Sequence, residues 1–391
     1  MKKINLSRRQ FISHSSALAL GVATSWCSNA STPQNSLGPN SSDQNKWQIP
    51  EQYRLAGLEV IKQSTVIDLH SHPGRFFLEG ADNIDPQIKS MTGGFEAKRI
   101  ADMTRGHVSA ALFSLVSDLS ILSPTKKGIA ASRDFLPGEA YTDFKRQLAI
   151  LQKMVKGSSI SQALSAEDII HAKKMNKPVA IFACEGANFV EHHLERLTEA
   201  YDAGVRAIGL VHYSSNLLGD IQTAPAIHGG LTKLGVKVVK EMNRLGIIVD
   251  LAHATQQTCE DTLSNSSSPV IVSHSNLLGK VNFPRFLNKD HASMIATSGG
   301  LIGAWPSGFD SRNLLDFANQ VVRLVEHVGV DHVAIGTDMD GNYKPVLTDY
   351  VDFPTLASLL LFRGLSASDC EKVFGGNFLR VFAQVSDLRT A

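Results

Sequence analysis

Short apolar runs alternate with longer amphipathic stretches along most of the chain. The apolar runs are rich in β-branched residues, and their alternation with helical stretches is typical of β/α units around a parallel sheet. Because each run is apolar almost throughout, we expect strands that are buried on both faces. The expected strands are residues 66–70, 108–114, 179–185, 207–212, 247–253, 270–274, 301–305 and 333–338.

The segments between these runs carry apolar residues at helical spacing. We expect helices over residues 231–245, 189–203 and 314–328, each of which is followed by a glycine that favours a helix end. Eight alternations favour an α/β fold of the (β/α)8 TIM-barrel type over an open doubly wound sheet. The lack of a Gly-x-Gly-x-x-Gly pattern after the first strand also argues against a dinucleotide-binding fold.

Composition and charge narrow the class of protein. The 391 residues are 43% apolar and 19% charged, and 38 Lys and Arg against 37 Asp and Glu leave a net charge of +1. Without a basic surplus, nucleic acid is not expected as a partner. No stretch approaches the roughly 20 apolar residues of a membrane-spanning helix. We therefore expect a globular enzyme or binding protein.

The first thirty residues have a different character. Arg8 and Arg9 lie in a segment that resembles a twin-arginine export signal, and a short apolar run follows at residues 17–23. We expect residues 1–30 to be a signal peptide, 31–50 a polar linker and 51–391 a single (β/α)8 domain. The twin-arginine machinery is then a partner, and the protein is exported to the periplasm or outside the cell. A lipid anchor at Cys27 is a weaker alternative.

The candidate chemistry lies where the expected strands end. In a barrel all carboxyl ends of the strands meet at one rim, which carries the active site. A lone histidine at a strand end is usually a core residue, but five of the 14 histidines and two carboxylates would meet here. These residues are His70, His72, Glu185, His212, His253, His274 and Asp338.

This residue set favours a metal centre. His70 and His72 are spaced to face the same way on a strand and to hold one ion. Glu185 can bridge two ions, with His253 and His274 completing the second site. Nitrogen-rich ligands with a bridging carboxylate favour Zn²⁺, while manganese, iron and cobalt stay open. Two ions ~3.5–4 Å apart would hold a hydroxide that attacks a carbonyl.

Asp338 at the last strand end is placed to take the proton of that nucleophile and to pass it to a leaving amine. The residues alone leave three interpretations open. The chain hydrolyses an amide bond, or it catalyses another amidohydrolase reaction on a lactone, an N-acyl-amino acid or a cyclic amide, or it is a non-catalytic metal-binding barrel. A proton-transferring carboxylate favours an enzyme over a binding protein.

From about residue 66 to residue 382 the chain resembles the membrane (renal) dipeptidase family. The resemblance rests on four segments in order: residues 230–253, 272–275, 336–341 and 376–382. It implies a binuclear zinc hydrolase on an amidohydrolase-like barrel. It also implies hydrolysis of dipeptides, including those with a D-residue at the carboxyl end, and leaves a homodimer open.

The resemblance also implies roles for single residues. His70, Glu185, His253 and His274 match metal ligands, with Glu185 as the bridge. Asp338 matches the acid/base carboxylate. His212 matches a histidine that contacts the substrate and the tetrahedral intermediate, and Arg285 matches an arginine that serves the same substrate.

One position departs from the family pattern. The family typically has His-x-Asp at the end of the first strand, whereas this chain has His70-Ser71-His72. One negative charge is therefore missing from the expected ligands. The first ion would be held less tightly, or would be a different metal.

Overall fold

The computed structural model describes residues 49–82, 84–90, 97–126 and 128–388. Within them a sheet of parallel strands runs in the order β1-β2-β6-β7-β8-β9-β10-β11 and curls into a nearly closed barrel. The isolated bridge between Ser71 and Met339 joins its first and last strand ends. The barrel strands are β1 (Val66–Ser71), β2 (Val108–Val116), β6 (Val179–Glu185), β7 (Val205–Gly209), β8 (Ile248–Asp250), β9 (Ile271–Ser275), β10 (Leu301–Ala304) and β11 (Val333–Ile335).

The expected (β/α)8 barrel is thus confirmed, but four strands end earlier than predicted, β10 by one residue and β7, β8 and β11 by three. β7, β8 and β11 end before His212, His253 and Asp338, which lie in the loops that follow. His253 and Asp338 have left-handed backbones, with φ of 69° and 53°, which no strand can continue. The chemistry-bearing residues therefore stand just beyond the strands, on turns that aim them inward.

At the carboxyl ends of the strands, two buried aspartate side chains accept hydrogen bonds from backbone N–H groups that are not paired within the sheet. Oδ1 of Asp250 accepts the backbone N–H groups of Ala252 at 3.0 Å and of Ser273 at 2.9 Å. Oδ1 of Asp68 accepts the N–H of Thr337 at 2.8 Å, and its Oδ2 accepts the hydroxyl of Thr337 at 2.5 Å. These carboxylates satisfy backbone donors that would otherwise be buried without a partner, and so hold neighbouring strand ends together.

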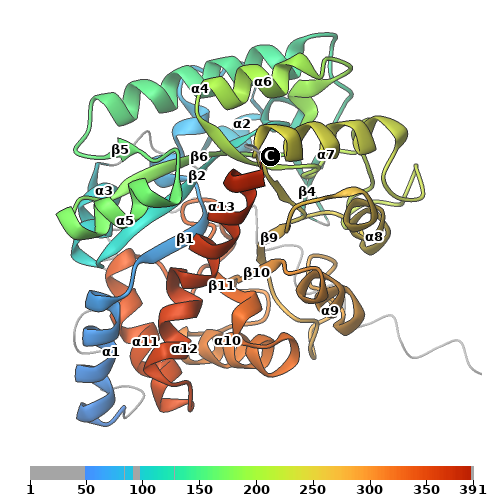
Figure 1. The fold of residues 1–391 in the computed structure, drawn as a ribbon. Coiled ribbons are helices and arrows are strands. Elements are labelled where there is room, and N and C mark those ends of the chain that lie inside the picture. The colour runs from blue at the N-terminus through green and yellow to red at the C-terminus, as the bar shows by residue number, and fades with distance from the viewer. Residues whose placement is uncertain (1–48, 83, 91–96, 127, 389–391) are drawn as a thin grey trace, which may run out of the picture.

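Helices form the outer layer around the barrel (Figure 1). In the described part of the chain no helix combines the length and apolar character needed to cross a bilayer. The helices are α1 (Glu51–Gln63), α2 (Pro86–Ser90), α3 (Lys98–Arg105), α4 (Glu139–Lys156), α5 (Ala166–Met175), α6 (Glu195–Asp202), α7 (Lys233–Leu245), α8 (Gln256–Asn265), α9 (Lys289–Thr297), α10 (Leu314–Val328), α11 (Phe353–Phe362), α12 (Ala367–Glu371) and α13 (Asn377–Asp387).

Two of the three predicted helices form. α10 has the predicted bounds, and α7 starts two residues late because the hydroxyl of Thr232 caps it by accepting the N–H of Gly235. Gly246 ends α7 with a φ of 74°, which glycine adopts without steric cost. The single helix predicted over residues 189–203 is wrong. Glu191 has a φ of 48°, so the segment divides into a 3₁₀ turn and α6.

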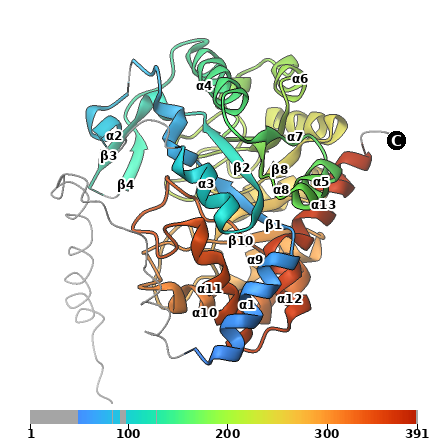
Figure 2. The same cartoon turned by 90° about the vertical axis from the view of Figure 1, so that its left-hand side faces the viewer.

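The two ends of the barrel differ. At the amino ends of the strands, Phe378, Val381 and Phe382 of α13 pack in one apolar cluster with the barrel interior, including Ile181 and Leu301. Figure 2 places α13 on the opposite side of the barrel from the hairpin of β3 (Leu122–Thr125) and β4 (Gly128–Ala131). We call the end covered by α13 the base, and the end formed by the carboxyl ends of the strands the mouth.

The expected signal peptide, residues 1–30, lies outside the described residues, as does the linker up to residue 48. The short strand β5 (Ser161–Gln162), which was not predicted, pairs with β6 beside the barrel. The long polar stretch after β2 folds into the β3–β4 hairpin and leads to α4.

Candidate metal centre

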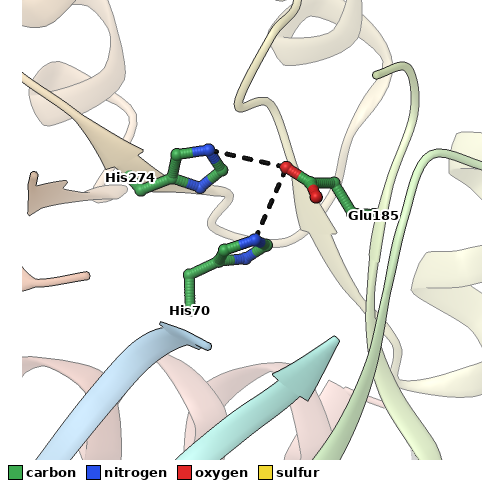
Figure 3. Close-up of side chains that lie close together, drawn as sticks. All are labelled: His70, Glu185 and His274. Carbon is green, nitrogen blue, oxygen red and sulfur yellow. Dashed lines mark ion pairs between the residues drawn. The ribbon is translucent and has the colours of Figure 1, made fainter. Parts of the chain in front are cut away.

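Glu185 ends β6 and lies at the centre of the mouth, with only 5% of its surface exposed. Its oxygen Oε1 lies 2.7 Å from Nε2 of His253, 3.4 Å from Nε2 of His70 and 3.5 Å from Nε2 of His274. Figure 3 shows His70 and His274 turned toward this same oxygen. Side chains from four barrel strands or the loops that follow them therefore meet at one carboxylate oxygen.

The second oxygen of Glu185 faces the other two histidines. Oε2 lies 3.2 Å from Nε2 of His212 and 3.5 Å from Nε2 of His72. Nε2 of His72 also lies 3.1 Å from Nε2 of His70 and 3.4 Å from Oδ1 of Asp338. The structure thus brings together all seven strand-end residues singled out from the sequence.

Contacts on the far sides of the rings fix how the histidines face the centre. The carbonyl oxygen of Ser114 lies 2.8 Å from Nδ1 of His72, so this nitrogen carries the proton and Nε2 presents a lone pair. The hydroxyl of Ser273 lies 3.0 Å from Nδ1 of His274. Nδ1 of His253 is buried and has no hydrogen-bond partner in the described part of the chain.

Asp118 is a site residue that the sequence analysis missed. It follows β2, is fully buried, and its Oδ1 lies 2.6 Å from Nδ1 of His212. Its Oδ2 accepts the N–H groups of Tyr213 at 3.0 Å and Ser214 at 2.8 Å. Asp118 therefore fixes both the ring of His212 and the loop that carries it. The strand-end rule would have found Asp118, had the second strand been extended to Val116.

Asp338 enters the site on a tight turn. Its N–H donates to the carbonyl of His70 at 2.8 Å, and its own carbonyl accepts the N–H of Gly341 at 2.9 Å. A Cβ on Gly341 would lie 2.5 Å from Oδ1 of Asp338 and 2.7 Å from the ring of His72. Only glycine lets the loop pass this close to the carboxylate and the ring.

Arg285 reaches the same centre from the loop after β9. It is 1% exposed, and its Nη2 lies 2.9 Å from Nε2 of His274. Its Nε donates to the side-chain oxygen of Gln222 at 3.3 Å. The arginine expected from the sequence is therefore inside the mouth and not on the surface.

The electrostatics of the cluster favour a carboxylate anion at Glu185, neutral rings at His253 and His274, and a charged ring at His70. Burial opposes ionisation of Glu185, but the surrounding histidines hold its pKa well below its usual range. Burial, aided by Arg285, holds the pKa values of His253 and His274 well below their usual range. Burial also opposes protonation of His70, but Glu185 and nearby aspartates raise its pKa to about 9.

The donor set fits metal ions. Three overlapping groups have ligand atoms within 4.8 Å of one another: His70, Glu185 and His274; His70, His72 and Asp338; and Glu185, His212 and His253. Two ring nitrogens that face each other at 3.1 Å need a proton or a cation between them. Imidazole nitrogen with carboxylate oxygen is a donor set of zinc and of other transition metals.

The chain is similar in sequence to known dipeptidases. The family model described as membrane dipeptidase, peptidase family M19, matches residues 56–391. Dipeptidase verJ of Clonostachys rogersoniana is 30% identical over 270 residues, covering 66% of this chain and 70% of that protein. Dipeptidase tcpJ of Claviceps purpurea (strain 20.1) is 28% identical over 318 residues, covering 78% and 72%.

Solved structures share the fold. The probable dipeptidase PvdM of Pseudomonas aeruginosa superposes with a TM-score of 0.71 at 21% identity, covering 87% of this chain and all of that one (100%). A metallo peptidase of Rhodobacter sphaeroides, liganded with a phosphinate mimic of L-Ala-D-Ala, gives 0.69 at 19% identity, covering 82% and 99%. At these identities the likeness shows the barrel alone.

Proposed function

This chain belongs to the membrane dipeptidase family, and we propose that it hydrolyses the amide bond of dipeptides with two zinc ions bound in the mouth. The observation that carries the proposal is the single carboxylate of Glu185, which faces five histidine nitrogens at 2.7–3.5 Å. A buried cluster of this composition is costly unless a cation is bound within it.

We assign the ligands as the sequence predicts them. His70 and His72, whose Nε2 atoms lie 3.1 Å apart, would hold one ion, and His253 and His274 would hold the other. Glu185 contacts members of both pairs, since Oε1 faces His70, His253 and His274 and Oε2 faces His72, and it would be shared between the two ions. With His72 in place of a carboxylate, this ligand set carries little negative charge.

The catalytic residues act around this centre. Bound zinc ions would polarise the scissile carbonyl and lower the pKa of the attacking water. Asp338, beside His72, takes the proton of that water and donates it to the leaving amine. His212, held by Asp118, directs Nε2 into the mouth, where it donates a hydrogen bond to the oxygen that becomes negative. Arg285 binds the substrate as a fixed cation.

The buried position of the cluster supports hydrolysis away from bulk water. Every residue of the Glu185 cluster is 1–8% exposed, so water is largely excluded from the reacting groups. The Rhodobacter sphaeroides peptidase carries a mimic of L-Ala-D-Ala. By analogy with it, the proposed substrates include dipeptides with a D-residue at the carboxyl end.

A metal titration combined with a dipeptide panel tests this function. We expect about two metal equivalents per chain, and hydrolysis of L,L- and L,D-dipeptides that chelation abolishes and Zn²⁺ restores. Glu185→Gln should lose metal and activity, whereas Glu195→Gln, at an exposed carboxylate, should retain both. Hydrolysis that survives chelation would rule out the metal mechanism, and one equivalent or fewer would rule out the two-ion assignment.

We also propose that the protein is exported in its folded state. The support is the Arg8-Arg9 pair followed by a short apolar run. Replacing both arginines by lysine should retain the protein in the cytoplasm, which cell fractionation would reveal. Unchanged secretion of this variant would contradict the twin-arginine route.

A further inference from the structure

Asp340 lies at the mouth but has no role in the mechanism above. It follows Asp338 by two residues, on the same turn, and its side chain is 7% exposed. Its Oδ2 accepts the backbone N–H of Gly74 at 2.7 Å, in the loop that follows β1. The Asp340 carboxylate therefore joins the turn that carries Asp338 to the loop that begins at His72.

Arg99 of α3 holds this carboxylate from the outer side. Its Nε donates to both carboxylate oxygens of Asp340 at 3.1 Å, and its Nη2 donates to Oδ1 at 2.7 Å. Its Nη1 donates to the carbonyl of Thr348 at 3.0 Å, and only 16% of the side chain is exposed. A planar guanidinium bound in this way fixes the orientation of a carboxylate as well as its position.

Both of the segments that Asp340 joins contain left-handed backbone. The φ angle is 65° at Gly74 and 55° at Arg75, in the loop after β1. It is 53° at Asp338 and 65° at Asp340, in the turn after β11. In residues other than glycine this conformation is unfavourable and persists only where surrounding contacts enforce it. The hydrogen bond from Gly74 to Asp340 and the ion pair with Arg99 supply such contacts.

These contacts act on the distance between Asp338 and His72, whose Oδ1 and Nε2 atoms lie 3.4 Å apart. Backbone hydrogen bonds, including one of 2.7 Å from the N–H of His72 to the carbonyl of Met339, join the two segments where they leave the strands. The contact of Asp340 with Gly74 joins them again further along. The loop after β1 is thus tied on both sides of His72. Such control matters because a displacement of about 1 Å in a reacting group can lower a rate about 100-fold.

We propose that Arg99 and Asp340 are positioning residues, which hold Asp338 at the distance from His72 that proton transfer needs. This inference rests on the proposed dipeptidase function and adds two residues that act through Asp338. An ion pair with a purely structural role would affect the free energy of unfolding and leave the turnover of the folded protein unchanged. A positioning role instead lowers kcat and leaves KM nearly unchanged, because the groups that bind the substrate stay in place.

Asp340→Asn tests this role by steady-state kinetics on L-alanyl-L-alanine. Asparagine tolerates the left-handed backbone and keeps an oxygen for the N–H of Gly74, but it lacks the charge that Arg99 pairs with. We expect kcat to fall about 10–100-fold and KM to change less than about twofold. Arg99→Gln should give the same pattern, and Arg99→Lys, which keeps the charge without the planar fork, should recover part of the loss.

Arg105→Gln is the matched control. Arg105 lies on the same helix and pairs with Asp102 at 2.6 Å, so this variant also removes an ion pair of α3, but none at the mouth. Its kcat should equal that of the wild type. A wild-type kcat in folded Asp340→Asn and Arg99→Gln, or an equal loss of kcat in Arg105→Gln, would overturn the inference.

A structural measurement separates this inference from the proposed function. In crystal structures of the zinc-loaded wild type and of Asp340→Asn, the carboxylate of Asp338 should differ in position relative to His72 by more than about 0.5 Å. A displaced carboxylate in a protein without dipeptidase activity would refute only the function. Dipeptidase activity with an Asp338 carboxylate that stays in place in Asp340→Asn would refute only the positioning role.

Discussion

The mouth and the base of the barrel are built from the same strands but bury opposite kinds of residue. In β6, Val179, Ile181 and Ala183 belong to the apolar cluster that α13 covers. Two positions further along the same alternation stands Glu185, surrounded by histidines. The base gains free energy from every apolar contact, whereas the mouth buries groups that prefer water.

This difference indicates that the base stabilises the fold, whereas the mouth carries the catalytic groups. Apolar burial at the base needs no ligand. The mouth holds five imidazole rings, a guanidinium and several carboxylates that satisfy each other only in part. We therefore expect substitutions at the mouth to change activity with little loss of stability, and substitutions at the base to do the reverse.

The largest expected effect is at Asp338. Asp338→Asn keeps the shape of the side chain, and asparagine tolerates the left-handed backbone at this position. Loss of the proton carrier should lower kcat about 10²–10⁴-fold, while the midpoint of thermal unfolding changes little. Steady-state kinetics and calorimetry on the same preparation measure both. Full turnover by this variant would remove Asp338 from the acid/base role.

Phe382 at the base should give the opposite result. Phe382→Ala empties a fully buried site under the barrel and should cost about 3–5 kcal/mol of unfolding free energy, as measured with denaturant. Turnover per folded molecule should stay near the wild-type value. A strong loss of kcat in protein that is still folded would show that the two ends are coupled.

His291 shows the effect of burial on the pKa of a histidine that lies outside the metal cluster. This histidine of α9 is 3% exposed, and burial lowers its pKa from 6.5 to about 4. The unfolded chain takes up this proton near pH 6.5, whereas the folded protein resists protonation down to about pH 4. The stabilisation by the neutral His291 ring is therefore fully present above pH 6.5. The free energy of unfolding falls by about 3 kcal/mol as the pH falls to 4.

The matched pair His291→Leu and His171→Leu tests this contribution, because His171 is exposed. The first variant should flatten the profile of unfolding free energy between pH 6.5 and 4, and the second should leave it as in the wild type. If both profiles match the wild type, His291 does not contribute to acid unfolding.

The smallest expected effect is at Asp118. Asp118→Asn keeps an oxygen for the loop N–H groups but weakens the hold on His212, so kcat should fall roughly 10–100-fold. Asp118→Glu, which keeps the charge, should recover part of the loss if its longer side chain still reaches Nδ1. Equal activity of the Asn variant and the wild type would make Asp118 a structural residue only.

The sequence predicted strands and helices correctly where a regular spacing of apolar residues determines them. Glu185 continues the two-residue alternation of β6 and was placed correctly. α10 follows an uninterrupted apolar stripe and has the predicted bounds. These elements depend on local pattern, which is visible in the chain itself.

The strand ends predicted from the sequence were wrong where contacts with residues distant in the chain determine the backbone conformation. β8 ends at Asp250 because that carboxylate takes the N–H of Ser273, and the register of β1 against β2 shifts between Asp68 and Ser71. Asp118 depends on a strand that is two residues longer than predicted. The buried Nδ1 of His253, which has no partner among the described residues, becomes visible only once its neighbours are in place.

The spread of the proposed ligands along the chain has a consequence for folding. They run from His70 in β1 to His274 in β9. No fragment that lacks β1 or β9 can complete this ligand set, so metal binding would report that the chain has folded at least as far as β9. A bound ion would in turn link β1 to β9, and its removal would lower the free energy of unfolding.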